Sequence, residues 1–208
     1  MKYRLIVFDF DGTLADSFPF LVSVVNTLAD RFAFRRIEDD EIATLRTYDT
    51  RRIMKHVGLP LWKVPLLAAS FRTLMSENIQ RIPLVQGIDD LLPALRERGF
   101  TLAIVSSNSD HNVRRVLGPR NEALVSHFEC GAAVLGKRAR LRRVSRRSGV
   151  ARHEILCIGD ETRDIDAARA EGMAAAAVTW GYAAPSALLA RSPTEVFTSP
   201  AEIAAKLI

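Results

Sequence analysis

The sequence predicts an α/β fold, in which a parallel β-sheet carries helices on both faces and a helical segment follows the first strand. Two observations lead to this class. Short apolar runs with β-branched residues alternate with helical stretches, which is typical of a parallel sheet. The segment 16–83 shows only helical periodicity, so it interrupts this alternation.

Four apolar runs are the predicted strands: residues 5–8, 101–105, 155–158 and, more weakly, 174–178. Helices are predicted over residues 88–98 and 162–171, each followed by a glycine. Glycine readily takes the left-handed conformation that closes a helix. Strand and helix therefore alternate along this part of the chain, with the helices on both faces of the sheet.

The segment 16–83, which we call the helical insert, is predicted to hold four helices. Ser17 is a candidate cap for the first of them and Asp49 or Thr50 for the third, because short polar side chains accept hydrogen bonds from the first helical N–H groups. We therefore predict two domains, with residues 1–15 and 84–208 forming the sheet domain and the helical insert forming the other.

Composition narrows the class of protein. The 208 residues are 48% hydrophobic and 25% charged, which is ordinary for a globular protein. No apolar run approaches the roughly 18 residues of a membrane helix, and the N-terminus does not have the pattern of a secretory signal. Cys130 and Cys157 lack the spacing of a metal or redox pair. We expect a cytoplasmic protein that does not bind membranes.

Positive charge is concentrated in the basic segment, residues 137–152, which contains eight Lys or Arg and no acidic residue. This segment predicts a solvated amphipathic helix with Leu141, Val144 and Val150 on its inward side. A nucleic-acid-binding face is the alternative, but no aromatic residues interleave for base stacking. Nucleic acid is therefore not favoured as a partner.

Polar residues follow the predicted strands, at the edge where open α/β sheets bind ligands. Asp9 and Asp11 come directly after the first strand, and Gly12 allows a tight turn. Two carboxylates this close repel each other unless a cation or a proton lies between them. The pair therefore predicts a divalent metal site in which one carboxylate is free to attack.

Three further groups of residues fit such a site. Asp160 and Asp164 follow the third strand, and hard cations such as Mg²⁺ take oxygen ligands of this kind. Ser106 and Ser107 follow the second strand and can bind phosphate oxygens through hydroxyl and N–H groups. Lys137 follows a strand-like run, 132–135, and can neutralise a phosphate.

The order of carboxylate pair, hydroxyl, lysine and carboxylate pair resembles the haloacid dehalogenase-like superfamily over nearly the whole chain. The similarity is to its phosphoglycolate phosphatase-like members, which carry a helical cap after the first motif. The matching residues are Asp9 to Leu14 for the first motif, Ser106 for the second, Lys137 for the third, and Gly159, Asp160 and Asp164 for the fourth. Many relatives have proline after the lysine, whereas Arg138 stands here, so Lys137 or a neighbouring arginine is the expected cation.

The resemblance implies a Rossmann-like core and a cap formed by the helical insert. It also implies a Mg²⁺-dependent phosphatase for a small phosphorylated metabolite, in which Asp9 is phosphorylated and Asp11 is general acid and then general base. The implied metal-binding residues are Asp9, Asp11 (through its backbone carbonyl), Asp160 and Asp164. The implied substrate-binding residues are Thr13, Ser106, Ser107 and Lys137.

Several alternatives are weighed against this interpretation. Asp11 favours phosphoryl chemistry over dehalogenation, because attack on carbon leaves no alkoxide to protonate. A phosphomutase shares all these residues and stays open, as does a nucleic-acid-associated protein that uses the basic segment. The cationic residues of the helical insert are candidates to meet an acidic leaving group, but solvation is the favoured expectation for them: Arg46, Arg51, Arg52, Lys55 and His56. Neither the substrate nor the oligomeric state follows from the sequence.

Overall fold

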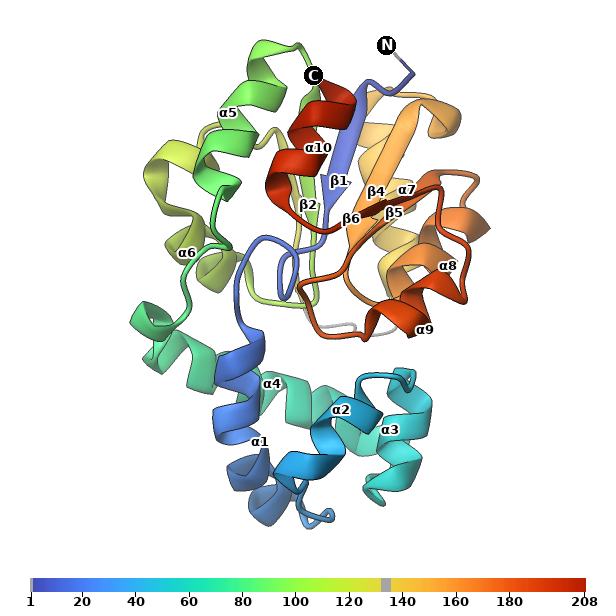
Figure 1. The fold of residues 1–208 in the computed structure, drawn as a ribbon. Coiled ribbons are helices and arrows are strands. Elements are labelled where there is room, and N and C mark those ends of the chain that lie inside the picture. The colour runs from blue at the N-terminus through green and yellow to red at the C-terminus, as the bar shows by residue number, and fades with distance from the viewer. Residues whose placement is uncertain (1, 132–135) are drawn as a thin grey trace.

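The computed structural model describes residues 2–131 and 136–208, which form a six-stranded parallel sheet with helices on both faces (Figure 1). The strand order is β3-β2-β1-β4-β5-β6. The strands are β1 (Leu5–Phe8), β2 (Thr101–Val105), β3 (His127–Glu129), β4 (Ile155–Gly159), β5 (Ala174–Val178) and β6 (Glu195–Phe197). This architecture confirms the predicted α/β, Rossmann-like fold class.

The strands β2, β1 and β4 begin level with one another and run in the same direction. Leu5 of β1 pairs with Thr101 of β2 and with Ile155 of β4, and the pairing continues in register to the last residue of β1. All four β1 residues are buried, as expected for a central strand of a parallel sheet. Asp9 and Asp160 therefore leave neighbouring strands at the same edge of the sheet.

Side chains of β1 alternate between the two faces of the sheet, and each face has its own helices. Ile6 and Phe8 belong to the core beneath one set of helices, and Leu5 and Val7 belong to the core beneath the other. The first set is α5 (Ile88–Glu97), α6 (Asp110–Glu122) and α10 (Pro200–Leu207). The second set is α7 (Lys137–Ser148), α8 (Thr162–Ala170) and α9 (Pro185–Leu189).

Two strands were not predicted. β3 and β6 are the edge strands, each three residues long, and only the last residue of each is fully buried. Short strands with polar residues such as His127 and Glu195 lack the apolar run that marked the central strands. The strand-like run at 132–135 lies outside the described residues.

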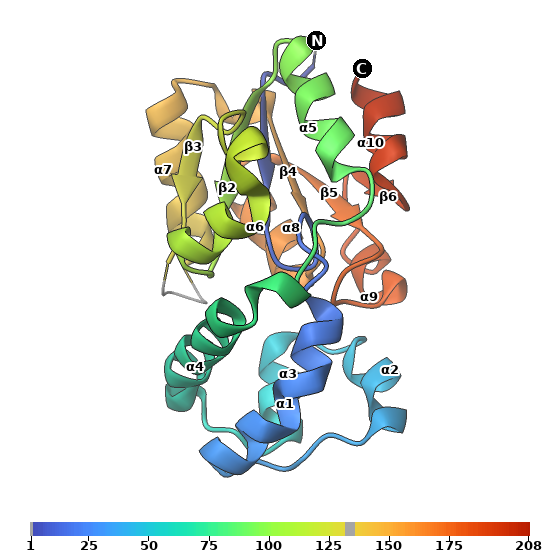
Figure 2. The same cartoon turned by 90° about the vertical axis from the view of Figure 1, so that its left-hand side faces the viewer.

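The helical insert contains only helices, 3₁₀ turns and the loops between them, as its periodicity predicted. The elements are α1 (Phe18–Phe32), a 3₁₀ turn (Asp39–Glu41), α2 (Ile42–Leu45), α3 (Thr50–His56), a second 3₁₀ turn (Leu61–Lys63), α4 (Val64–Glu77) and a third (Ile79–Arg81). Both views show these helices grouped beyond the carboxyl ends of the strands (Figures 1 and 2). The exact domain boundaries remain a prediction.

The two predicted helix caps in the insert have different outcomes. The Asp49 carboxylate accepts a hydrogen bond from the Arg52 N–H at 2.8 Å, so it caps α3. Ser17 precedes α1, but its hydroxyl makes no capping bond and lies 2.9 Å from the hydroxyl of Tyr182 instead. Ser17 therefore occupies the predicted N-cap position, but the predicted side-chain bond is absent because its hydroxyl pairs with a residue of the sheet domain.

The basic segment forms α7 and the turn after it, with Leu141 and Val144 buried as predicted. Five of its arginines form ion pairs with two buried glutamates: Arg138, Arg142 and Arg152 with Glu171, and Arg143 and Arg147 with Glu129. These pairs support the solvated-helix interpretation, while the absence of nucleic-acid binding remains a prediction. Within the described residues, no helix has the length and apolar character needed to cross a bilayer.

Candidate active site

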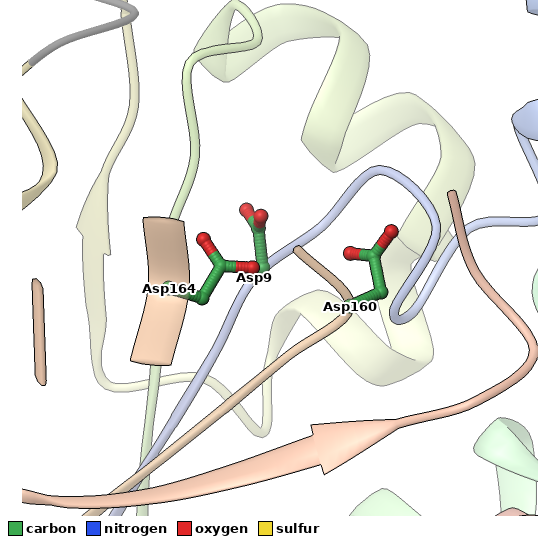
Figure 3. A group of neighbouring side chains, drawn as sticks. All are labelled: Asp9, Asp160 and Asp164. Atoms are coloured by element: carbon green, nitrogen blue, oxygen red, sulfur yellow. The ribbon is translucent and has the colours of Figure 1, made fainter. Parts of the chain in front are cut away.

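Three buried carboxylates gather at the carboxyl edge of the sheet. Asp9 follows β1, Asp160 follows β4, and Asp164 lies in the first turn of α8 (Figure 3). Each contributes a carboxylate oxygen to a group whose oxygens all lie within 4.8 Å of one another. This upper limit is slightly above the roughly 4 Å between opposite oxygen ligands of one octahedral Mg²⁺.

The buried carboxylates of the cluster repel one another, and burial makes their ionised forms unfavourable unless positive charge compensates them. Burial raises the pKa of Asp9, and the charge of Lys137 opposes this shift. Burial and the charge of Asp164 raise the pKa of Asp160 well above its ordinary value. The donor set is hard oxygen and the negative charge is in excess, so these residues fit a bound divalent cation.

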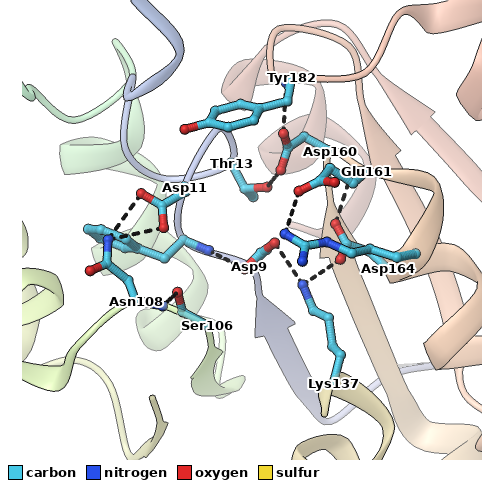
Figure 4. Close-up of polar contacts among 12 residues, drawn as sticks. Asp9, Asp11, Thr13, Ser106, Asn108, Lys137, Asp160, Glu161, Asp164 and Tyr182 are labelled. Carbon is cyan, nitrogen blue, oxygen red and sulfur yellow. Dashed lines mark hydrogen bonds and ion pairs between the residues drawn. The ribbon is translucent and has the colours of Figure 1, made fainter. Parts of the chain in front are cut away.

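Lys137 is the cation of the predicted motif that the structure brings to this cluster, where the buried Arg163 also lies close to Asp9 and Asp164. Its ammonium lies 2.7 Å from Asp9 Oδ2 and 2.5 Å from Asp164 Oδ1, at the start of α7 (Figure 4). Burial lowers the pKa of Lys137, but the charges of Asp164 and Asp9 outweigh this effect and raise it. Lys137 rather than its neighbour Arg138 therefore reaches the site, since Arg138 pairs with Glu171.

Asp160 is fixed by the turn that follows β1. Its two carboxylate oxygens accept hydrogen bonds from the Thr13 hydroxyl and from the Tyr182 N–H, each at 2.8 Å. Gly12 has a φ of +74°, and a Cβ there would lie 2.2 Å from Asp160 Oδ2. Only glycine leaves room for the Asp160 carboxylate at this position, so the Asp-Gly-Thr turn packs directly against that carboxylate.

Asp11 lies apart from the three-carboxylate cluster and has its own partner. Both of its carboxylate oxygens accept hydrogen bonds from the Asn108 side-chain amide, at 3.2 and 3.1 Å (Figure 4). Burial, and next the charge of Asp9, raise the pKa of Asp11 to about 7, although the Asn108 bond opposes this. A carboxyl group with this pKa can give and take a proton near neutral pH.

The loop after β2 places Asn108. The Ser106 hydroxyl accepts a hydrogen bond from the Asn108 N–H at 2.9 Å, and Ser106 is buried. The Asn108 side-chain oxygen in turn accepts from the Ser109 N–H at 2.8 Å and from the Asn112 amide at 3.0 Å. Asn108 is thus held on several sides, and it orients the Asp11 carboxylate.

The helical insert contacts this edge of the sheet through two arginines that the sequence did not assign to the site. Arg46, which follows α2, donates to the carbonyls of Tyr182 and Gly181 at 2.9 and 2.7 Å. Arg72 of α4 donates to the carbonyl of Ser107 at 3.3 Å. The expectation that Arg46 is solvated was therefore wrong, because backbone carbonyls beside the site bind its guanidinium.

A cavity of about 310 Å³ lies between the helical insert and the sheet edge. Asp11, Ser107, Asn108 and Tyr182 line it from the sheet side, and Arg72 is among the residues from the insert. Asp11 therefore faces a space in which a leaving group can lie. The structure thus gathers Asp9, Asp160, Asp164 and Lys137 in one cluster and places Asp11 beside this cavity.

Other predicted residues have different surroundings. The buried Thr13 hydroxyl donates to Asp160, and the Ser106 hydroxyl accepts from Asn108, so substrate binding by either remains a prediction. The Asp11 side chain does not belong to the three-carboxylate group, and metal binding through its carbonyl likewise remains a prediction. Tyr182 was missed because no motif marks it.

Known proteins resemble this chain over nearly its whole length. The family model for haloacid dehalogenase-like hydrolases matches residues 6–178. A phosphoglycolate phosphatase from Synechococcus elongatus is 35% identical over 201 residues, covering 96% of this chain and 95% of the relative. Another from Haemophilus influenzae is 26% identical and covers 97% of each chain. The solved structure of a haloacid dehalogenase-like hydrolase from Streptococcus pneumoniae has the same fold, with a TM-score of 0.81, 19% identity, and coverage of 100% of this chain and 99% of that one.

The chain therefore belongs to the haloacid dehalogenase-like hydrolase family. Within this family it is a phosphoglycolate phosphatase-like member and a phosphoric monoester hydrolase. The family and the enzyme class predicted from the sequence motifs are thereby confirmed.

Proposed function

We propose that this enzyme is a Mg²⁺-dependent phosphatase that hydrolyses a small phosphorylated metabolite through a phosphoaspartate on Asp9. The observation that carries the proposal is the buried group of Asp9, Asp160 and Asp164, with the Lys137 ammonium 2.7 Å from Asp9 Oδ2. Nucleophile, positive charge and metal-binding oxygens are thus concentrated at one point.

Asp9, Asp160 and Asp164 would hold Mg²⁺, and Asp11 would add its backbone carbonyl. The ion supplies positive charge that offsets repulsion between the phosphoryl oxygens and the Asp9 carboxylate. Lys137 adds a second positive charge and keeps Asp9 ionised, because its ammonium contacts Asp9 directly. Thr13 positions Asp160 through its hydrogen bond.

In the first step, a carboxylate oxygen of Asp9 bonds to phosphorus and the ester P–O bond breaks. Asp11 gives its proton to the departing alkoxide oxygen. In the second step, Asp11 takes a proton from a water molecule, whose oxygen bonds to phosphorus and releases phosphate and Asp9. Asn108 orients Asp11 for both transfers through its two hydrogen bonds.

The substrate class rests on the relatives. Because the chain is 35% identical to a phosphoglycolate phosphatase, phosphoglycolate is the first compound to test. We expect the enzyme to act in the cytoplasm, where such metabolites are found.

The test is phosphate release from p-nitrophenyl phosphate and phosphoglycolate, with Mg²⁺ and with a chelator. We expect Mg²⁺-dependent activity that falls about a thousandfold or more in Asp9→Asn, and a phosphoryl adduct on the Asp9 peptide of the wild type. Asp16→Asn, an exposed aspartate of the same segment, is the matched control and keeps its activity. Equal rates for wild type and Asp9→Asn overturn the proposal. Net phosphate release also separates hydrolysis from the phosphomutase alternative.

A further inference from the structure

The cavity between the helical insert and the sheet edge is lined mainly by apolar side chains of the insert. A volume of about 310 Å³ lies between α1, α3, α4 and the sheet edge, partly open to solvent, and most of its lining is apolar. Val22 and Val25 of α1, Ile53 of α3, and Leu67 and Phe71 of α4 all face it and are only half-buried. Protein interiors are normally packed with few voids larger than a water molecule. An apolar surface of this extent is destabilising unless something apolar covers it.

The cavity extends to Asp11, the candidate general acid. Asp11 and Ser107 contribute to the same lining as the apolar side chains, so a molecule in the cavity reaches the candidate general acid. A cavity of about 150 Å³ is sufficient for benzene, so this one has room for roughly ten carbon atoms. A molecule that binds here would therefore place its phosphate ester near Asp11 and the rest of its surface against apolar side chains.

Charge around the cavity does not favour a strongly acidic leaving group. The exposed Arg51, Arg52 and Lys55 of α3 are absent from the described lining of the cavity. Arg46, Arg72 and Arg163 do line it. Arg46 and Arg72 donate hydrogen bonds to backbone carbonyls of the sheet domain, and Arg163 pairs with Glu161, which also lines the cavity. The apolar walls on α1, α3 and α4 are therefore the larger recognition surface.

From this arrangement we infer that the enzyme prefers phosphate monoesters whose alcohol is apolar and several carbons long. The apolar part of the alcohol lies among the side chains of α1, α3 and α4, while the ester oxygen faces Asp11. This inference rests on the proposed function, because it describes the leaving group of that same reaction.

A series of n-alkyl phosphates tests the inference, because ethyl, butyl, hexyl and octyl phosphate have leaving groups of nearly equal acidity. We expect kcat/KM in the presence of Mg²⁺ to rise about threefold for each added methylene, as burial of a CH₂ group allows, until the cavity is filled. Ala68 lines the cavity, whereas its neighbour Ala69 is exposed on the same helix. Ala68→Leu should therefore lower kcat/KM for hexyl phosphate about tenfold more than for ethyl phosphate, whereas Ala69→Leu should match the wild type.

Two results overturn the inference while the proposed function stands. One is a kcat/KM that stays flat or falls along the series while ethyl phosphate or phosphoglycolate is hydrolysed in an Asp9-dependent way. The other is an identical chain-length profile for Ala68→Leu and Ala69→Leu. If no ester is hydrolysed, the proposed function fails as well.

Discussion

The guanidinium of Arg46 donates a 2.9 Å hydrogen bond to the carbonyl oxygen of Tyr182, a residue from the opposite end of the sequence. The Tyr182 N–H bonds the carboxylate of Asp160. Arg46 therefore connects the helical insert to a proposed metal ligand through a single residue. We therefore expect Arg46 to be a positioning residue, which acts through the loop that carries Tyr182.

We expect Arg46→Ala to lower kcat/KM about tenfold, because two charged hydrogen bonds to the loop are lost and the insert is held less firmly. Arg36→Ala is the matched control, since Arg36 lies in the same insert and forms an exposed ion pair with Asp30. Steady-state kinetics on one phosphate ester compare the two variants. Equal activity in both would show that the Arg46 contact does not position the site.

Gly12 and Gly58 share a backbone conformation, so comparing their alanine variants distinguishes the effect of backbone strain from that of a steric clash. Gly12 and Gly58 have φ values of +74° and +72°, but only at Gly12 would a Cβ collide with another group, at 2.2 Å from Asp160 Oδ2. We expect Gly58→Ala to lower the free energy of unfolding by about 1 kcal/mol without changing activity. Gly12→Ala carries the same strain and also displaces Asp160, so kcat/KM should fall about a hundredfold. Urea unfolding and kinetics measure both, and an active Gly12→Ala variant would contradict the proposed role of Asp160.

The edge of the sheet that holds the site could be predicted because it depends on short sequence patterns, an apolar run followed by an acidic residue. Asp9 and Asp160 each end an apolar run, and in-register pairing of parallel strands brings such ends together. Lys137 could be placed only through the family resemblance, because its motif is a single residue within a basic run. The structure brings its ammonium to Asp9 and Asp164.

The contacts of the helical insert could not be predicted, because they depend on how the insert docks onto the sheet. Arg46 and Tyr182 are 136 residues apart, and helical periodicity shows which face of a helix is apolar but not which loop it meets. The same reasoning applies to Ser17, whose position before a helix indicated a cap, while its actual partner is the Tyr182 hydroxyl. The cavity was also missed, since periodicity does not reveal whether apolar faces pack fully.

The pH dependence of the first chemical step should report on Asp11. Its pKa is raised to about 7, first by burial and then by the charge of Asp9. As the general acid it must be protonated, so the rate of phosphoryl transfer from an alkyl phosphate should fall as the pH rises above about 7. p-Nitrophenolate leaves without a proton, so single-turnover rates with its phosphate should lack this decline. The same decline with both esters would assign the titration to another group.

Binding of Mg²⁺ should be measurable without any substrate, because the carboxylate cluster is buried and carries excess negative charge. At a Mg²⁺ concentration about a hundred times the Kd, linkage predicts a rise in melting temperature of roughly 5 °C. Asp164→Asn removes one charge from the cluster and should reduce this rise to less than half. Asp166 lies two residues further along α8 and forms an exposed ion pair with Arg191. The Asp166→Asn variant should therefore show the full Mg²⁺-induced rise in melting temperature. Equal Mg²⁺-induced rises in the two variants, measured by calorimetry, would exclude Asp164 from the metal site and leave Asp9 and Asp160 to hold the ion alone.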